Sequence, residues 1–352
     1  MFSIIKSFLF KIDPEKAHNL AINSLKLNCI PNNFFKVRDE EVLEVNLFGK
    51  KFSNPIGIAA GFDKSAEVYN ALFKIGFGFV EVGTVTPLKQ FGNSKPRIFR
   101  LEKDEALINR LGFNNDGSDI IYKRILENRP KGILGINIGP NKDSKNQEND
   151  FLICFKKFFN LADYITINIS SPNTENLRDF HNENKLISLI KKINQEKNDL
   201  KSDIPVMLKV SPDIEEDIIN SIAKIALENK ISAIIVSNTS ERNRENLKDT
   251  QSIEKGGLSG KPIETISNEL IRKFFNIVKK QIPIIGVGGV DSAESAYNKI
   301  LSGASLIQLY TGMIYQGPYL IKKIKEELIK KLKSDGVKNL NEIIGQKDLA
   351  KF

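Results

Sequence analysis

Hydrophobic residues along most of the chain follow two alternating patterns. Short apolar runs typical of buried strands take turns with longer segments that have helical periodicity, such as 214–228 and 262–280. The predicted strands are 56–60, 79–84, 132–137, 164–168, 205–210, 233–237, 283–287 and 306–310. Eight strand–helix units predict an α/β protein with a closed (β/α)₈ (TIM) barrel. A doubly wound open sheet is the alternative, and it is disfavoured because no Gly-x-Gly-x-x-Gly element follows the first strand.

The start of the chain has a different pattern. Residues 1–40 are expected to form an amphipathic helical extension, and residues 41–352 the catalytic barrel domain. Within 2–12, apolar residues fall on one helical face, beside Lys6 and Lys11. Such a face either packs against the main domain or lies on a membrane interface, and the pattern leaves both open.

A second helix and a hairpin are expected before the first barrel strand. Asp13 followed by Pro14 is a typical helix start, and this helix is expected to end near residue 31. Residues 42–52 predict a small β-hairpin that turns near Gly49.

Composition narrows the possible functions. The 352 residues are 41% hydrophobic and 27% charged, as in soluble globular proteins, and the net charge of +9 is spread among acids, so nucleic-acid binding is not expected. The only cysteines are Cys29 and Cys154 and the only histidines His18 and His181, so neither a disulfide framework nor a metal site is expected. No apolar run reaches the roughly 18 to 20 residues of a membrane span, and no cleavage site follows the first segment, so no signal peptide is expected.

Polar and glycine residues cluster where the predicted strands end, which is where barrel enzymes carry their active sites. Each alone could be an ordinary turn residue, but Lys64 and Lys209 would not be tolerated unpaired in a buried barrel mouth. Gly288–Gly289 and Thr311–Gly312 follow the last two strands and suggest a phosphate site. Lys209 can place a cation beside the N1 and O2 edge of a flavin, and an ion pair with Asp163 is the alternative.

Six strings at these positions resemble one known family. They are Ala60-Gly-Phe-Asp-Lys64, Asn109-Arg-Leu-Gly-Phe-Asn-Asn115, Asn168-Ile-Ser-Ser-Pro-Asn-Thr174, Gly256-Gly-Leu-Ser-Gly260, Gly286-Val-Gly-Gly289 and Gln308-Leu-Tyr-Thr311. Together, from about residue 10 to about residue 330, they resemble dihydroorotate dehydrogenase. The resemblance implies an FMN-bearing barrel that oxidises (S)-dihydroorotate to orotate in UMP biosynthesis.

The resemblance also implies a class and a route for electrons. The soluble class uses a catalytic Cys and the membrane-associated, quinone-dependent class a Ser; Ser171 stands at the matching position. The helical extension then becomes a peripheral membrane anchor and quinone entrance, with His18, Arg100 and Tyr310 near the quinone. We expect a monomer on the cytoplasmic side of a bacterial plasma membrane.

The remaining site residues are likewise implied by the resemblance. Substrate would be held by Lys64, Asn109, Arg110, Leu111, Gly112, Phe113, Asn168, Asn173, Asn238 and Thr239. FMN would be held by Ala60, Gly61, Thr84, Asn137, Asn168, Lys209, Ser237, Gly260, Gly289, Tyr310 and Thr311. Ser171 is the expected base, with Thr174 and a water as proton relay. The family pattern leads us to expect Thr at position 237, and Ser keeps the hydroxyl.

Three alternatives remain for the function. Another FMN barrel such as a hydroxyacid oxidase would need a His after a late strand, and none follows His181. A soluble-class dihydroorotate dehydrogenase would need a Cys near position 171. A barrel that only binds a nucleotide or a partner would leave Lys64 and Lys209 unexplained.

The segment 240–261 is expected to be a loop over the active site, or else a plain surface insertion.

Overall fold

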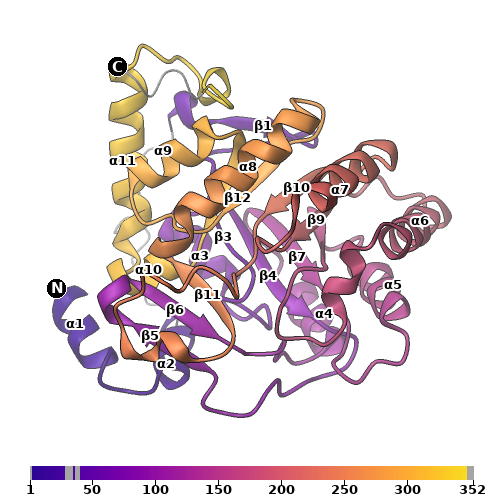
Figure 1. Ribbon diagram of the computed structural model, residues 1–352, viewed down its shortest axis with the longest axis horizontal. Helices are drawn as coiled ribbons and strands as arrows, with labels where there is room; N and C mark the ends of the chain where they lie inside the picture. The colour runs from indigo at the N-terminus through magenta and orange to yellow at the C-terminus, as the bar shows by residue number, and fades with distance from the viewer. Residues whose placement is uncertain (1, 28–34, 36–39, 347–352) are drawn as a thin grey trace.

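Eight parallel strands form a closed barrel at the centre of the protein (Figure 1). The computed structural model describes residues 2–27, 35 and 40–346. The barrel strands, in their order around it, are β3 (Ile56–Ile58), β4 (Phe79–Val85), β7 (Ile133–Ile138), β8 (Tyr164–Asn168), β9 (Val206–Val210), β10 (Ala233–Val236), β12 (Ile284–Val287) and β13 (Ala304–Leu309). The predicted (β/α)₈ barrel and all eight predicted strands are therefore confirmed.

Helices follow each barrel strand and cover the outside of the barrel. They are α3 (Tyr69–Ile75), α4 (Ser118–Glu127), α5 (Gln147–Phe158), α6 (Glu183–Asp199), α7 (Glu216–Glu228), α8 (Glu264–Val278), α9 (Ala293–Leu301), and after the last strand α10 (Thr311–Gln316) and α11 (Tyr319–Ser334). Their apolar stripes face the strands; on α7, for example, Ile219, Ile222 and Ala226 are buried. Burial of these stripes supplies most of the core, because each CH₂ group removed from water contributes about 0.8 kcal/mol.

The predicted hairpin closes the amino-terminal end of the barrel. Strands β1 (Val45–Leu47) and β2 (Lys50–Phe52) pair antiparallel. The two turn residues, Phe48 and Gly49, both have positive φ angles (57° and 68°), as a two-residue hairpin turn requires. The ring of Phe52 contacts that of Phe79, at the start of β4, with the centroids 5.5 Å apart.

A three-stranded antiparallel sheet, absent from the sequence prediction, covers the carboxyl ends of the barrel strands. It consists of β5 (Ile98–Leu101), β6 (Ala106–Asn109) and β11 (Gly257–Gly260), and it buries a small apolar cluster of its own. Because β11 belongs to the segment 240–261, that segment is tied to β6 by a ladder in which Gly257 faces Asn109. Figure 1 shows this sheet between the N-terminal helices and the barrel.

The N-terminal extension contains two helices, as predicted. They are α1 (Phe2–Leu9) and α2 (Pro14–Lys26), and Asp13 caps α2 by accepting a hydrogen bond from the Lys16 amide at 2.9 Å. Helix α2 contacts β5 of the covering sheet. The expected end of this helix near residue 31, like Cys29, lies outside the described residues. Within 2–27 and the rest of the described chain, no helix is both long and apolar enough to span a bilayer.

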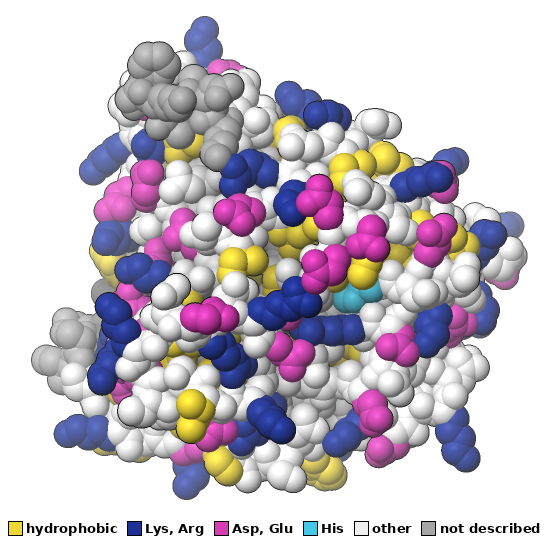
Figure 2. Space-filling model, in the orientation of Figure 1, with side chains coloured by type: hydrophobic (Ala, Val, Ile, Leu, Met, Phe, Trp, Pro, Cys, Tyr) yellow, Lys and Arg dark blue, Asp and Glu magenta, His cyan; other side chains and the backbone are white. Residues whose placement is uncertain are grey.

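Charges of both signs are mixed on the surface. On the face in Figure 2, Lys and Arg side chains alternate with Asp and Glu and form no continuous basic patch. Many charged side chains of the described residues form ion pairs, for instance Lys50 with Asp163 at 2.7 Å. The net charge of +9 is therefore not concentrated on this face.

Candidate active site

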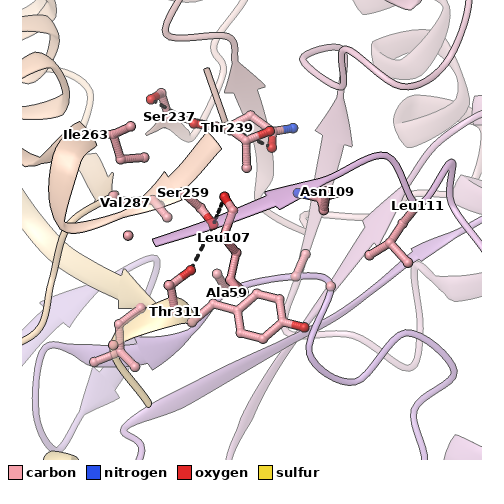
Figure 3. A pocket seen from close by; sticks show the side chains of 18 of the residues that line it. Ala59, Leu107, Asn109, Leu111, Ser237, Thr239, Ser259, Ile263, Val287 and Thr311 are labelled. Atoms are coloured by element: carbon pink, nitrogen blue, oxygen red, sulfur yellow. Dashed lines mark hydrogen bonds between the residues drawn. The ribbon is translucent and has the colours of Figure 1, made fainter. Parts of the chain in front are cut away.

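One cavity lies where the barrel strands end, beneath the covering sheet. The space between the lining residues amounts to about 1320 Å³, part of it open solvent. In Figure 3, Leu107 and Asn109 lie on β6 across the cavity, with Ser237 and Thr239 on another side. The expected site residues that line it are Ala60, Gly61, Lys64, Thr84, Asn109, Leu111, Gly112, Phe113, Asn168, Ser171, Asn173, Lys209, Ser237, Asn238, Thr239, Gly260, Gly289, Tyr310 and Thr311.

Ser171 follows β8 and is only 5% exposed. Its Oγ accepts a hydrogen bond from the Asn173 amide at 3.2 Å, which leaves the hydroxyl proton free for another acceptor. The Asn173 side chain donates to the carbonyl oxygen of Asn109 on β6 at 3.2 Å. The loop that carries Ser171 is therefore fixed to the covering sheet.

Two lysines provide buried positive charge in the cavity. Burial lowers the pKa of Lys64 to about 8. Burial also lowers the pKa of Lys209, while the negative charge of Glu81 partly opposes the shift. Lys209 has no ion-pair partner among the described residues, and the alternative partner Asp163 pairs with Lys50 instead. An unpaired buried ammonium group is costly, so Lys209 is suited to an anionic or electron-rich ligand.

The last two strand ends combine glycine backbone with hydroxyl groups. Gly288 and Gly289 have φ angles of 119° and 76°, and a Cβ on Gly289 would lie 2.4 Å from the side chain of Glu264. Thr311, the first residue of α10, contacts the Ser259 hydroxyl on β11 at 2.9 Å, the bond drawn in Figure 3. This corner has the backbone shape and hydroxyl groups that suit a phosphate.

Three of the residues expected to hold substrate or FMN or to relay the proton lie outside the cavity lining. Arg110 pairs with Glu254 at 2.7 Å, so its guanidinium group is directed to the 240–261 segment. Asn137 is fully buried behind Thr84 and Asn168 and contacts both. Thr174 is 5% exposed, and its proposed part in a proton relay stays a prediction.

Comparison with known proteins identifies the family. A sequence model of the family described as dihydroorotate dehydrogenase matches residues 42–332. The chain belongs to the dihydroorotate dehydrogenase family. A protein of Idiomarina loihiensis named dihydroorotate dehydrogenase (quinone) is 44% identical over 335 residues, 93% of this chain and all of that one. A protein of Bartonella henselae with the same name is 45% identical over 340 residues, 95% of this chain and 93% of that one.

Solved structures agree with this membership of the dihydroorotate dehydrogenase family. The crystal structure of DHODH from Eimeria tenella in complex with ferulenol superimposes with a TM-score of 0.91 and 37% identity, covering 96% of each chain. The ligand-free DHODH from the same organism also gives a TM-score of 0.91, with 38% identity, and covers 95% of this chain and 99% of that one. The relatives carry the name of the quinone class of dihydroorotate dehydrogenase, the class that Ser171 predicted.

The N-terminal helices of this chain meet the cavity at an aromatic cluster. The ring of His18 on α2 lies 5.3 Å from that of Phe62 and 6.4 Å from that of Tyr310, and Phe62 lies 5.7 Å from Tyr310. Burial and the positive charge of Lys64 lower the pKa of His18 to about 3. His18 lines a second, more polar cavity that also reaches Lys64, and Tyr310 lines the first.

Arg100 has a structural contact that the sequence did not suggest. Its guanidinium group donates to the carbonyl oxygens of Phe10 and Ile12 at 3.3 and 2.8 Å, and it lies 4.8 Å from the Phe10 ring centroid. It therefore binds the turn between α1 and α2, and it lines neither of the two cavities described. Its proposed place near a quinone stays a prediction.

Several residues of the site escaped the sequence analysis. Leu107 and Ser259 reach the cavity from the covering sheet. The runs Ile98–Leu101 and Ala106–Asn109, separated by four charged residues, are a signal for two strands that could have found the sheet. Glu81, fully buried in an apolar strand, is also informative, because carboxylates are almost never buried without partners.

Proposed function

We propose that this protein oxidises (S)-dihydroorotate to orotate, with FMN as prosthetic group and a quinone as electron acceptor, in UMP biosynthesis. Family membership and the names of the relatives support the reaction. The observation that carries it to this chain is the cavity lining. A single cavity holds the serine, the asparagines and both lysines that the reaction needs: Ser171, Asn109, Asn168, Asn173, Asn238, Lys64 and Lys209.

The cavity has the chemistry of a flavin site. Lys209 supplies a buried cation without a carboxylate partner among the described residues, and Asn114 Oδ1 is a buried acceptor without a hydrogen bond. A Cβ on Gly61 would have no neighbour nearer than the Tyr310 ring at 3.6 Å, so open space lies above this backbone. We assign the isoalloxazine edge to Lys209 and the phosphate to the corner of Gly289 and Thr311. A flavin held by these residues would supply the acceptor for the hydride at C6 of the substrate.

Substrate recognition follows from the asparagines. Each amide side chain offers a donor and an acceptor, which matches the alternating N–H and C=O groups of the dihydroorotate ring. Lys64 provides positive charge for the substrate carboxylate. Leu111 and Phe113 supply the apolar part of the pocket.

Ser171 is the base that removes the C5 proton. A hydroxyl is a weak base, and the Asn173 amide that donates to its Oγ stabilises negative charge there during transfer. Thr174 with a water carries the proton onward. The covering sheet, fixed through β11 and β6, keeps bulk water away from this step.

Electrons leave toward the N-terminal helices. Tyr310 touches the flavin cavity on one side, and its ring lies near His18 on the other, so a quinone bound beside α2 is close to the flavin. Phe8 is 65% exposed, and Ile5, Leu20 and Leu27 are exposed too, which gives α1 and α2 an apolar outer face with Lys6 beside it. We infer a monomer that lies on the cytoplasmic face of a bacterial plasma membrane through these helices.

The experiment uses the purified holoprotein without oxygen. Dihydroorotate should bleach the flavin absorbance, and a short-chain quinone should restore it. Absence of bleaching would refute the dehydrogenase, and restoration by fumarate or NAD instead of quinone would refute the quinone class.

Membrane association is tested separately by flotation with anionic vesicles. The intact protein should float and Phe8→Asp should float less. Equal flotation of both proteins would argue against the helical face as the membrane contact.

A further inference from the structure

Glu81 is a buried carboxylate inside the barrel, below the cavity. It lies in the middle of β4, has no exposed surface, and receives hydrogen bonds from three other strands. Oε1 accepts from Asn137 Nδ2 at 2.8 Å, while Oε2 accepts from Gln308 Nε2 at 2.9 Å, Tyr164 Oη at 3.1 Å and Thr166 Oγ1 at 3.2 Å. Four donors surround it, the arrangement suited to an ionised carboxylate.

A carboxylate can only accept, so it decides which way its neighbours turn. Asn137 must present its NH₂ group to Glu81, and its oxygen therefore faces the cavity side. That oxygen accepts from Thr84 Oγ1 at 2.6 Å and from Asn168 Nδ2 at 3.2 Å. Without the carboxylate, the Asn137 amide could turn over at little cost, because its two ends have the same shape.

The orientation of the Asn137 amide in turn determines which groups donate and which accept among the residues that line the site. Because the NH₂ group of Asn168 is used toward Asn137, its oxygen accepts from the backbone amide and the hydroxyl of Ser170 at 3.2 and 2.7 Å. The Ser170 hydroxyl has then donated its proton, so it accepts from Asn238 Nδ2 at 2.8 Å. Thus the charge of Glu81 fixes the donor and acceptor direction of a series of hydrogen bonds. The series reaches the cavity residues Asn168 and Asn238, and it includes Ser170, the residue before Ser171.

The same charge acts on Lys209. Asn168 and Lys209 are paired on the neighbouring strands β8 and β9. Among the described residues, Glu81 is the carboxylate whose negative charge raises the pKa of Lys209 against the effect of burial. The negative charge of Glu81 therefore favours the charged form of the lysine that we assign to the flavin edge. A negative charge near a flavin opposes its reduction, since reduction adds electron density to the ring.

We propose that Glu81 is a positioning residue that sets the hydrogen-bond polarity of Asn137, Asn168 and Asn238 and, through its charge, the reduction potential of the flavin. The proposal rests on the proposed function, because it needs the flavin in this cavity. The competing explanation is that Glu81 only ties four strands together. In that case any lost hydrogen bond to its carboxylate should have the same consequence.

The test compares Glu81→Gln with Tyr164→Phe in the FMN-loaded protein. Glu81→Gln keeps the shape but removes the charge and adds donors, whereas Tyr164→Phe removes one hydrogen bond and keeps both charge and polarity. The readouts are the flavin midpoint potential, measured for the wild type and both variants at the same pH, and the dissociation constant for orotate. A thermal melt of both variants measures the structural contribution of each contact.

For Glu81→Gln we expect orotate to bind at least about tenfold more weakly and the potential to rise by about 30 mV, the equivalent of a tenfold bias for a two-electron couple. For Tyr164→Phe we expect a lower melting temperature, an orotate affinity within about twofold of the wild type and a potential within about 10 mV of it. Equal shifts in the two variants, or unchanged potential and affinity in Glu81→Gln, would overturn the proposal.

Two further outcomes are decided in the same experiment. If Glu81→Gln does not fold, Asn137→Ala interrupts the chain one step above the carboxylate, and unchanged orotate affinity in that variant overturns the proposal. If dihydroorotate fails to bleach the wild type, the proposed function fails and this inference with it. A bleached wild type whose variants behave alike refutes the inference alone.

Discussion

The ion pair between Glu15 and Arg97 should hold the N-terminal helices on the barrel. Its removal should slow reoxidation of the flavin by quinone without slowing reduction of the flavin by dihydroorotate; these are the two half-reactions of the enzyme. Glu15 is in the first turn of α2, and Arg97 precedes β5. The two side chains make a bidentate contact, with Nη2 to Oε1 at 2.6 Å and Nε to Oε2 at 3.0 Å. The side chains are only 12% and 6% exposed, so the pair is largely shielded from water.

The burial of the Glu15–Arg97 pair sets the free energy that is lost when Glu15 is removed. Removing one partner of a buried pair costs about 3–5 kcal/mol, because the other charge is left without compensation. Arg97 keeps two carbonyl contacts, to Phe91 at 2.6 Å and to Asn93 at 2.8 Å, so we use the lower value for Glu15→Ala. About 3 kcal/mol is a shift of roughly 100-fold in the equilibrium between docked and undocked helices.

The assay measures each half-reaction in the same preparation. In Glu15→Ala, bleaching of the flavin by dihydroorotate should stay within about twofold of the wild-type rate, since the hydrogen bonds described for Ser171 and Asn173 join these residues to each other and to the covering sheet and not to α2. Reoxidation by quinone should slow by at least about tenfold, and hydrogen exchange over residues 14–26 should accelerate. Lys26→Ala is the control on the same helix α2, because it removes the ion pair of Lys26 with Glu67. The Lys26 side chain is 42% exposed, so neither half-reaction nor the hydrogen exchange of α2 should change much.

Lowering the pH should weaken the docking of the N-terminal helices in the same way as Glu15→Ala. Burial raises the pKa of Glu15, but the hydrogen bond and charge of Arg97, with Lys95, outweigh burial, so the net pKa is lowered. A carboxylate with a lowered pKa stabilises the docked state fully above its unfolded pKa of about 4.5, and this contribution is lost as the pH falls through the folded value. The reasoning is refuted if Glu15→Ala leaves both quinone reoxidation and exchange unchanged.

Three other predictions concern single residues. Ser171→Ala should slow flavin reduction at neutral pH by about 10²–10⁴-fold in stopped flow, and an unchanged rate would exclude Ser171 as the base. Gly135→Ala should lower the melting temperature strongly, because its Cβ would lie 2.0 Å from the Tyr164 ring; a melt like that of the wild type would show that the ring can move aside. His18, with its pKa lowered to about 3, should stay neutral, so quinone reoxidation should show no ionisation of His18 between about pH 5 and 8; a titration near pH 6.5 that disappears in His18→Gln would contradict this.

The sequence predicted the barrel because its signals are local. Each strand is a short apolar run, each helix has its own periodic stripe, and the repetition of eight such units leaves few ways to bury them. The cavity lining was predictable for the same reason, since parallel strands bring all their carboxyl ends to one rim. Asn168 and Lys209, 41 positions apart in sequence, thereby become neighbours.

The covering sheet could not be predicted in this way. Four of the eight barrel strands, β7 to β10, lie between β6 and β11 in the chain, and the pairing of β6 with β11 depends on where the barrel brings them. The orientation of the Arg110 side chain also depends on the pairing of β6 with β11. Its partner Glu254 comes within reach only when the 240–261 segment lies against β6. The contact of Arg100 with the turn after α1 has the same long-range origin.

By itself the sequence determined the barrel, the ring of residues at its strand ends and the serine that indicates the quinone class, since all of these follow from local pattern and motif. Only the tertiary structure decided which of those residues face the cavity and which support others from behind. Asn137 shows why: the family resemblance implies a cofactor contact for it, but the buried charge of Glu81 orients its amide and makes it a link between the barrel interior and the site. The orientation of a polar group depends on its partners, and those partners come together only when the barrel closes.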